Sequence, residues 1–543
     1  MSLYALLFRP KATPQSEPID ARQVANNAGG YVFAIDDWAR LDRFLVLGSD
    51  APTYYQSARA LTRENAKAVL DCLAADATRV VSRIVEISLS GRAPKQDPAI
   101  FALALATLDE KPETRALAYA AVPKVCRTAS HLFQFVATAK ALGKGFGRGM
   151  KRAVAAWYDD KPVEAVAYQA IKYRSREGFD HERLLDMARP DAHVGEAEYD
   201  ALYRWMIGKE YDAAKLHPLV SAHLAAMKAE NAAELLPPIA EHRLPWEALP
   251  TWANSDPEVW CAMLPHLGLT ALIRNLGNMS RIAAIKPLDG SEQTVAQRIG
   301  DEKALAKARV HPLAILQAMA VYRSGRGVRG AGSWEPSQVV LDALDGAFYK
   351  AFSNVEPTGK RHLIALDVSG SMGSQFGGTV LTCREATAAL ALVTMAVEPA
   401  THVVGFTSAG HHQGQYGGMH GGGSTELTPL TISPRQRLTD AVAAVSGLPF
   451  GGTDCALPML YAMEKRLKVD AFVVMTDNET WAGKIHPVEA LRDYRKRMGI
   501  AAKLVVVGMT STGFSIADPV DGGMLDVVGF DAAAPAVIAD FLR

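Results

Sequence analysis

The chain has 543 residues, of which 49% are hydrophobic and 21% are charged. This composition is typical of folded domains and excludes a disordered chain, and the length predicts two or more domains. Lys plus Arg and Asp plus Glu balance at 58 each, so a surface for nucleic acid would have to be a local basic patch.

The cysteines and the first residues predict the compartment. Cys72, Cys126, Cys261, Cys383 and Cys455 are scattered and lack CxxC spacing, which favours reduced thiols in a cytoplasmic protein over a disulfide framework or a zinc site. The start of the chain has a short apolar run but neither a basic leader nor a long apolar region, so no signal peptide is expected. No apolar run is long enough to cross a bilayer, and no membrane partner is expected.

Residues 1–355 are predicted to form a helical domain. Prolines at positions 10, 14 and 18 predict an extended arm over residues 1–20. Amphipathic, alanine-rich segments with short links then predict an α-solenoid of paired helices, without a clean repeat period. The predicted helices cover residues 62–75, 77–89, 98–108, 112–122, 129–142, 147–158, 162–173, 182–187, 196–206, 218–229, 232–239, 257–263, 269–279, 292–299, 301–306, 312–322 and 336–352.

A strongly basic stretch lies within residues 124–176, with eleven Lys or Arg against three acidic residues. Its glycine-rich loop, residues 143–149, leads into a predicted helix whose first turn is basic, against the helix macrodipole. A bound polyanion would relieve this repulsion, and interleaved aromatic side chains could stack on unpaired bases. The cations could equally be solvated while the aromatics fill inter-helix space. The candidate RNA-binding cations are Lys140, Lys144, Arg148, Lys151, Arg152, Lys172, Arg174 and Arg176.

A second polar set recurs at i, i+4 and i+7, on one face of the helix predicted over 269–279 and its continuation. Its members are Arg274, Asn278 and Arg281. They could line the inside of a curved solenoid and hold single-stranded RNA, or form a polar network between helices. Both interpretations stay open, with Arg274 and Asn278 as candidates for RNA contact.

Residues 356–543 are predicted to form an α/β domain. Apolar strands alternate with helices, which predicts a doubly wound parallel sheet. The segment 408–424 is glycine-rich with three histidines, and a flexible surface loop is favoured there over a metal site. Strands are predicted over 362–366, 402–406, 471–476, 503–507 and 524–528, and helices over 381–397, 434–446, 456–467, 487–498 and 532–541.

Oxygen-bearing side chains follow strand and turn segments of this second domain. Asp367, Ser369 and Ser371 alternate just past the first strand, Thr453 follows a glycine turn, and Asp477 follows the strand 471–476. Strand ends of such a sheet meet at one edge, and oxygen ligands suit a hard divalent cation, Mg²⁺ above others. The alternative is a serine-rich turn without metal.

This combination resembles the metal-ion-dependent adhesion site of von Willebrand factor A domains, which are Rossmann-like. The resemblance implies that Ser369, Ser371 and Thr453 contact the cation directly, while Asp367 and Asp477 act mainly through water. It also implies that the cation bridges to an acidic residue of a protein partner and does not activate water. Since no nucleophile-elbow, phosphate-loop or zinc-protease motif is present, no enzymatic activity is expected. A metal-dependent nuclease is the rival expectation.

The helical domain resembles the TROVE module through the segments 26–31, 41–48, 53–55, 271–279 and 311–327. With the second domain, nearly the whole chain resembles the Ro autoantigen family in a bacterial form. The resemblance implies HEAT-like repeats closed into a ring, with the second domain where the ends meet. Such closure by the chain itself favours a monomer.

The same resemblance implies the function. A small noncoding RNA of the Y type would bind the basic outer face, and His181 would contact RNA. Single-stranded ends of misfolded or decaying RNA would enter the ring, in RNA quality control and stress response with an exoribonuclease partner. The alternative is a metal-dependent protein-adhesion scaffold with incidental RNA binding.

Overall fold

A computed structural model describes residues 12–26, 28–34, 37–47, 66–90, 96–308, 310–327, 332–375, 380–408, 425–446, 453–477, 480–509, 514–528 and 534–543. Segment 53–55 of the TROVE resemblance lies outside this set, as does the glycine- and histidine-rich loop from residue 409 on. Among the helices of the described residues, none combines the length and the apolar character that crossing a membrane requires.

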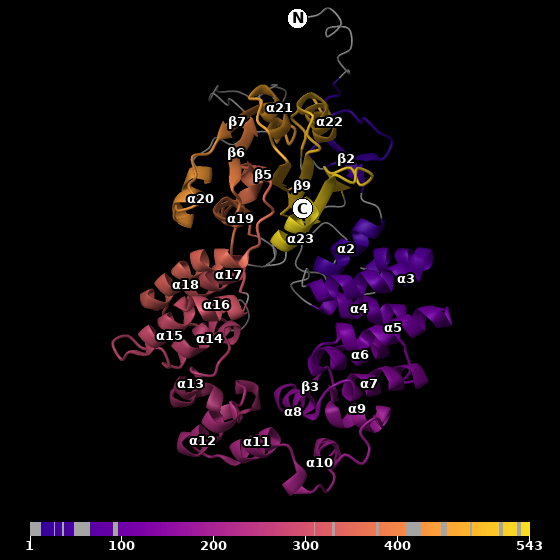
Figure 1. Cartoon of the computed structure of the whole chain (residues 1–543), viewed down its shortest axis with the longest axis vertical. Helices are drawn as coiled ribbons and strands as arrows, with labels where there is room; N and C mark the ends of the chain where they lie inside the picture. The colour runs from indigo at the N-terminus through magenta and orange to yellow at the C-terminus, as the bar shows by residue number, and fades with distance from the viewer. Residues whose placement is uncertain are drawn as a thin grey trace, which may run out of the picture.

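The first arm of the ring consists of helices stacked in two layers. Helices α3, α5, α7 and α9 contact one another in order, and α2, α4 and α6 form the second layer, which faces the opposite arm (Figure 1). The bounds are α2 (Asp37–Leu47), α3 (Lys67–Ser90), α4 (Asp97–Ala106), α5 (Pro112–Val125), α6 (Ala129–Ala141), α7 (Arg148–Asp159), α8 (Val163–Lys172), β3 (Ser175–Arg176), β4 (Phe179–Asp180), α9 (His181–Ala188) and α10 (Ala197–Met206).

The solenoid then turns and returns along the second arm to the C-terminal domain (Figure 1). The predicted α-solenoid closed into a ring is thereby confirmed. The bounds are η2 (Ala213–Lys215), α11 (Pro218–Lys228), α12 (Ala232–His242), η3 (Trp246–Ala248), η4 (Thr251–Ser255), α13 (Pro257–Met263), α14 (Leu269–Arg281), α15 (Ser291–Gly300), α16 (Glu302–Ala308), α17 (Pro312–Arg323), α18 (Gln338–Lys350) and η5 (Ala351–Asn354).

Two local features depart from the predicted helices. The boundary predicted between two helices at residue 76 is a kink inside α3, because Asp76 has a non-helical backbone (φ −155°, ψ 89°). Helix α2 was not predicted at all. Its apolar residues Leu41, Phe44 and Leu45 are completely buried against the ring core.

The C-terminal domain is a six-stranded sheet with the strand order β11-β9-β8-β5-β6-β7. Five strands are parallel, as predicted, but β7 runs antiparallel to β6. The doubly wound sheet of five predicted strands is therefore confirmed, and β7 is an additional antiparallel edge strand that was not predicted. The strand β7 is polar and ends in a proline, a residue that sheets tolerate at edges, so it lacks the apolar signal of a central strand. The strands are β5 (Arg361–Asp367), β6 (Ala400–Ser408), β7 (Thr425–Pro429), β8 (Ala471–Thr476), β9 (Lys503–Gly508) and β11 (Met524–Val528).

Alternate residues of each strand face opposite sides of the sheet. Ile364 and Leu366 pack into the core shared with α19 and the ring helices, whereas Leu363 and Ala365 pack with α21 and α22. The sheet is thus covered on both faces, as expected for a doubly wound fold. The helices are η6 (Gly370–Gly373), α19 (Cys383–Val397), α20 (Leu438–Ser446), α21 (Leu457–Glu464), α22 (Pro487–Met498) and α23 (Ala534–Leu542).

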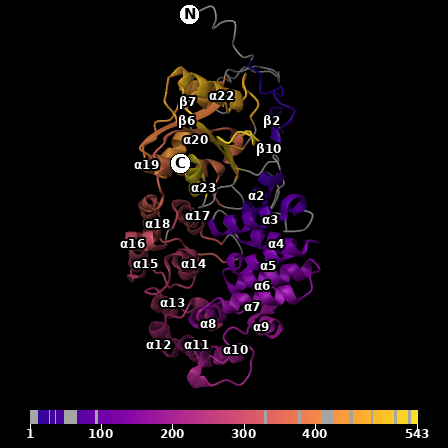
Figure 2. The same ribbon diagram turned by 45° about the vertical axis from the view of Figure 1, so that its right-hand side comes forward.

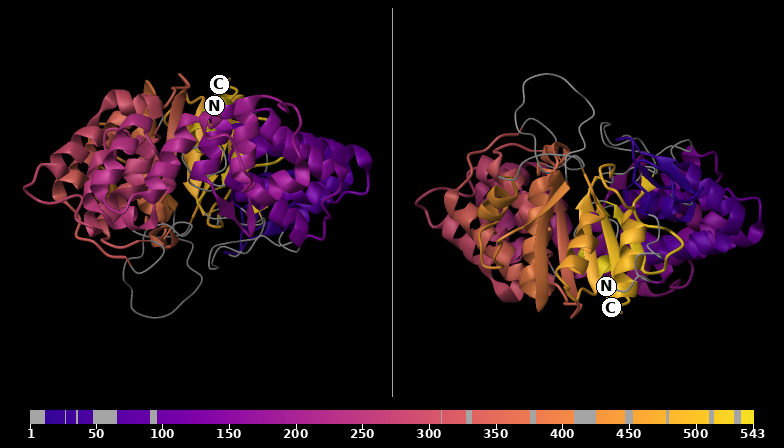
Figure 3. Two further views of the ribbon diagram at one scale, coloured as in Figure 1. Left: turned by 90° about the horizontal axis from the view of Figure 1, so that it is seen from below. Right: turned by 90° about the horizontal axis from the view of Figure 1, so that it is seen from above.

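Residues 12–26 and 28–34, the described part of the chain before α2, pack on the C-terminal domain. Strands β1 (Gln23–Ala25) and β2 (Tyr31–Ala34) form a hairpin, and β2 pairs with β10 (Phe514–Ser515) of the C-terminal domain (Figure 2). Seen from above, this indigo segment lies beside the yellow part of the chain (Figure 3, right). We call residues 12–26 and 28–34 the N-terminal strap. Because the other end of the ring contacts α19 through α17 and η5, both ends meet the C-terminal domain.

Candidate metal centre and nucleic-acid interface

The predicted metal residues gather at the carboxyl end of the sheet. Asp367 ends β5, and Asp477 follows the neighbouring strand β8. The Ser371 hydroxyl donates a hydrogen bond to Asp477 Oδ2 (2.6 Å), and the hydroxyl oxygens of Ser369 and Ser371 lie 2.9 Å apart. The Ser369 N–H donates to Asp367 Oδ1 (2.8 Å). These four side chains therefore form one continuous set of oxygens.

Thr453 reaches the same edge from another loop. It is buried, and its carbonyl oxygen accepts hydrogen bonds from the N–H groups of Trp481 (3.0 Å) and Ala482 (3.1 Å). The loop that carries Thr453 is thereby tied to the segment that follows Asp477. The preceding residues 451 and 452 and the following residues 478 and 479 lie outside the described part of the chain.

The burial and the pKa of Asp367 show how these oxygens would interact with a cation. Asp367 is 1% exposed, and burial, together with the nearby Asp477 carboxylate, raises its pKa to about 7. Hydrogen bonds from Ser369 and from the Thr476 hydroxyl (2.8 Å to Oδ2) act in the opposite direction. Two buried carboxylates beside three hydroxyls suit a hard divalent cation, whose charge would offset their repulsion. The residues at this end of the sheet therefore fit a divalent cation.

No group of three or more His, Cys, Asp or Glu side chains placed to hold a metal occurs in the described part of the chain. The histidines of the glycine-rich loop lie outside it.

The cations at the α6–α7 connection are largely exposed. Arg148, Lys151 and Arg152 are exposed on the first turns of α7, and Lys144 in the preceding loop is partly buried. Burial and the nearby Arg115 lower the pKa of Lys144. The first turn of α7 has no acidic residue and no side-chain cap, so its N–H groups remain without a side-chain acceptor from the N-cap. We call Lys144, Arg148, Lys151 and Arg152 the α7 basic cluster.

Gly149 brings this cluster close to helix α5. A Cβ atom at position 149 would lie 2.6 Å from the Tyr119 ring, too close for any side chain. Because α7 belongs to the outer layer of the ring, Arg148, Lys151 and Arg152 lie on an outer helix and Lys144 lies in the loop before it (Figure 1).

The remaining cations of the basic stretch differ in their contacts. Lys140 is exposed, and its Nζ lies 5.9 Å from the centre of the Phe179 ring. Lys172 Nζ lies 3.1 Å from the Tyr168 hydroxyl and 3.9 Å from a Glu247 carboxylate oxygen. Lys172 therefore has partners within the chain.

The two exposed arginines after Lys172 also contact their own chain. Arg174 donates to the Met227 sulfur (3.1 Å), and the Arg176 guanidinium lies 3.8 Å from Asp97. Arg174, Arg176 and Lys172 thus have contacts within the chain. They differ in this way from the α7 basic cluster, whose arginines and Lys151 extend into solvent.

His181, for which an RNA contact was predicted, lies inside the fold in this RNA-free structure. It is buried, its Nδ1 lies 2.8 Å from the Tyr158 hydroxyl, and its Nε2 lies 3.0 Å from the Tyr173 carbonyl. Burial lowers its pKa to about 4, so the ring is neutral at pH 7. An RNA contact by this side chain finds no support in the structure, because both ring nitrogens have partners within the fold. The histidine instead links the start of α9 to α7 and to the end of α8.

The members of the second polar set, Arg274, Asn278 and Arg281, have different surroundings in the structure. Arg274 is exposed on α14, a helix on the inner side of its arm (Figure 1). Asn278 instead donates to the Asn254 carbonyl (3.3 Å) and accepts a bond from Arg281 (2.6 Å). Arg274 therefore stays a candidate for RNA contact, while Asn278 belongs to a polar network between helices.

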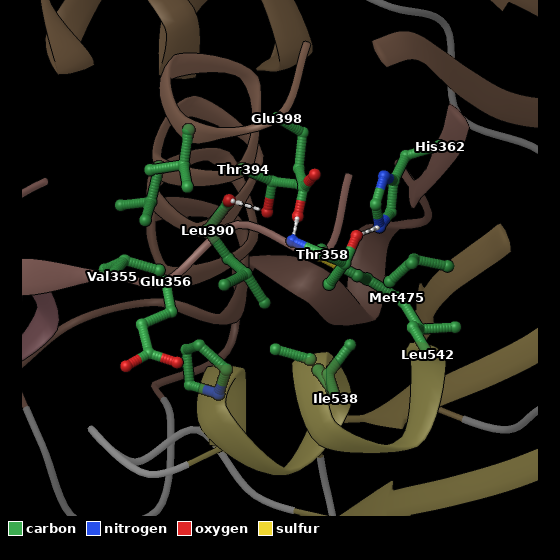
Figure 4. Close-up of a pocket in the computed structure, with 15 residues that line it drawn as sticks. Val355, Glu356, Thr358, His362, Leu390, Thr394, Glu398, Met475, Ile538 and Leu542 are labelled. Carbon is green, nitrogen blue, oxygen red and sulfur yellow. Dashed lines mark hydrogen bonds between the residues drawn. The ribbon is translucent and has the colours of Figure 1, made fainter. Parts of the chain in front are cut away.

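A pocket lies where the ring joins the C-terminal domain, at the start of β5 and so at the opposite edge of the sheet from Asp367 (Figure 4). Side chains of α19 and α23, including Leu390 and Ile538, make most of its wall apolar. Glu398 accepts hydrogen bonds from the N–H groups of Thr358 (2.6 Å) and Gly359 (3.0 Å), which fixes the connecting turn. The pocket is separate from the metal residues.

Comparisons with known proteins cover both parts of the chain. A TROVE domain model matches residues 24–237 and 196–324, and a Ro60 vWA domain model matches residues 361–542. The RNA-binding protein RO60 of Deinococcus radiodurans is 43% identical over 543 residues, covering 99% of this chain and 98% of that protein. The RNA-binding protein RO60 of Caenorhabditis elegans is 34% identical over 606 residues, covering 97% and 91%.

A solved structure is also similar to this chain over nearly its whole length. The crystal structure of the Deinococcus radiodurans RO (RSR) protein superimposes with a TM-score of 0.74 and 42% sequence identity. The match covers 94% of this chain and 99% of the other.

Proposed function

Since the chain belongs to the Ro60 family, with a TROVE domain followed by a Ro60 vWA domain, we propose that it is an RNA-binding ribonucleoprotein component without enzymatic activity. The observation that carries the proposal is the α7 basic cluster on an outer helix of the ring. Its relatives are named RNA-binding proteins, in agreement with this surface.

The α7 basic cluster suits a folded RNA better than a base-specific contact. Its cations attract phosphates and release counterions, and the uncapped N–H groups of α7 offer further phosphate donors. Duplex RNA is recognised mostly through its shape and backbone. We therefore assign to this face a small structured noncoding RNA of the Y type.

The inner side of the ring is assigned to single-stranded RNA ends. Arg274 is exposed on α14, and Tyr168 on α8 is 36% exposed, so that a base could stack on its ring. On this proposal the protein is a cytoplasmic monomer that holds misfolded or decaying RNA during quality control and stress. An exoribonuclease partner would degrade the RNA that it holds.

The metal centre supports an additional binding function. Ser369, Ser371, Thr453, Asp367 and Asp477 would hold a divalent cation, most simply Mg²⁺, directly or through water. The cation would supply a charge that attracts a carboxylate of a protein partner. Metal-dependent protein adhesion with incidental RNA binding is the second candidate function. It is favoured by the close placement of Asp367, Ser369, Ser371 and Asp477 at one sheet edge.

Recovery of RNA from the native cell tests the main proposal. A variant with Lys144, Arg148, Lys151 and Arg152 changed to Glu should lose an abundant small RNA that the wild type retains. With purified components, the slope of log affinity against log salt should fall by roughly 3 to 4, because up to four phosphate contacts are removed.

The matched control changes four exposed cations of the C-terminal domain, Lys465, Lys468, Lys496 and Arg497, to Glu. It produces the same change in net charge and should retain the RNA. Equal loss in both variants would assign the binding to net charge alone. Absence of an enriched RNA even in the wild type would favour metal-dependent adhesion.

A further inference from the structure

The N-terminal strap makes its most buried polar contact beside the metal loops. Gln15 is completely buried, and its Nε2 donates hydrogen bonds to Asp454 Oδ1 (2.7 Å) and to the Ile485 carbonyl (2.9 Å). Its Oε1 accepts a bond from the Thr480 hydroxyl (2.6 Å). One amide group therefore joins two loops of the C-terminal domain from the opposite end of the chain.

A second contact comes from the turn between β1 and β2. Asn26 donates from Nδ2 to the Thr480 carbonyl (2.7 Å), and its Oδ1 accepts from the N–H of Gly30 (2.8 Å). A Cβ atom at Gly30 would lie 2.0 Å from that same Thr480 carbonyl oxygen. This close approach explains why position 30 is a glycine.

The two loops that the strap joins are those that carry metal residues. Asp454 directly follows Thr453, and the Thr480 hydroxyl, three residues beyond Asp477, accepts a bond from the Cys455 N–H (3.1 Å). The Thr453 carbonyl in turn accepts from the N–H groups of Trp481 and Ala482. The position of Thr453 relative to Asp477 therefore depends on a network in which Gln15 is a central member.

We propose that Gln15 is a positioning residue for the metal centre, so that cation binding and docking of the N-terminal strap strengthen each other. The inference rests on the proposed metal site. Linkage requires reciprocity: if the docked strap increases the cation affinity by some factor, the cation stabilises the docked strap by the same factor.

The N-terminal strap leads directly into the helical ring. Its last strand, β2, is followed after two residues by α2, the first described helix of the solenoid. A cation at the metal centre would thus hold one end of the ring against the C-terminal domain, and its release would weaken that closure.

Calorimetric titration of the full chain with Mg²⁺ tests the proposal. Gln15→Ala should weaken Mg²⁺ binding about tenfold, within the range usual for coupled sites. The control is Gln169→Ala in α8, which removes another interhelical amide contact, to the Ala129 N–H (2.8 Å), far along the sequence from the metal loops. Its Mg²⁺ affinity should equal that of the wild type.

Thermal unfolding distinguishes positioning from simple structural support. A merely structural Gln15 would lower the melting temperature equally in EDTA and in Mg²⁺, whereas a positioning residue reduces the increase that Mg²⁺ produces. If Gln15→Ala does not fold, hydrogen exchange of the wild type decides: amides of the strap should exchange at least severalfold more slowly when Mg²⁺ is added. Equal exchange with and without bound Mg²⁺ would overturn the coupling alone, and absence of Mg²⁺ binding by the wild type would overturn the metal site with it.

Discussion

The proposed metal centre and the α7 basic cluster differ in how deeply their side chains are buried and how firmly these are held. Asp367 and Thr453 are 1% and 5% exposed, and hydrogen bonds fix the oxygens around them, as selection of a small ion requires. Arg148, Lys151 and Arg152 instead extend from a helix into solvent. Long, exposed cations can follow the irregular path of a polyanion. A rigid buried site and an adaptable exposed one therefore suit an ion and an RNA, and the two should respond separately to mutation.

The largest test of this separation is Asp367→Asn. We expect Mg²⁺ affinity to fall about 10- to 100-fold, the usual effect of losing a group that orients a metal site. RNA affinity should stay within about twofold, because the α7 basic cluster lies in the other domain. Calorimetry with Mg²⁺ and a filter-binding assay with a hairpin RNA measure the two quantities. A parallel loss of RNA affinity would show that the two regions act as one site.

Acid should affect the ring through its buried histidines. The pKa of His181 is about 4 in the folded chain, against an ordinary 6.5, so the unfolded chain binds the proton more readily. Stability is therefore lost as pH falls from 7 to 5, by about 2 kcal/mol from this residue. His131 and His311, whose pKa values burial also lowers to about 4, add to the effect.

His181→Gln removes the titration while keeping a side chain able to form hydrogen bonds. Its free energy of unfolding, measured with denaturant at pH 7 and pH 5, should change by about 2 kcal/mol less than that of the wild type. A loss of RNA affinity at pH 7 in a folded His181→Gln would restore the RNA contact that the buried geometry does not support.

The smallest expected effect compares two single cations. Arg152→Met removes an exposed charge and should lower the salt slope of RNA binding by about one. Lys172→Met removes a charge that already faces Glu247 and should change the slope by less than half as much. Titrations at several salt concentrations measure both, and equal slopes would show that the contacts of Lys172 are exchanged for phosphates on binding.

Much of the fold could be predicted because its elements carry local signals. The strands β8 and β11 were predicted with their observed bounds. The proximity of Asp367 and Asp477 could be expected because the ends of parallel strands meet at one edge. The polar strand β7 and the short strand β10 have no such signal. The orientation of His181 depended on a tertiary contact, its bond to Tyr158, which the sequence does not encode locally.

The contacts of the N-terminal strap are also not encoded in the local sequence. Gln15 lies in a proline-rich segment that predicts an extended arm, and nothing in its neighbourhood indicates Thr480 or Asp454 as partners. Only the assembled domains bring these residues together.

The distance along the chain between these partners also sets an order for biosynthesis. Gln15 emerges from the ribosome 465 residues before Thr480, a delay of roughly half a minute to a minute and a half at ordinary translation speeds. During that time the helices can stack as they are made, but the strap lacks the surface on which it docks. Closure of the ring is therefore one of the last events of synthesis, and the nascent solenoid spends most of its translation as an open arc.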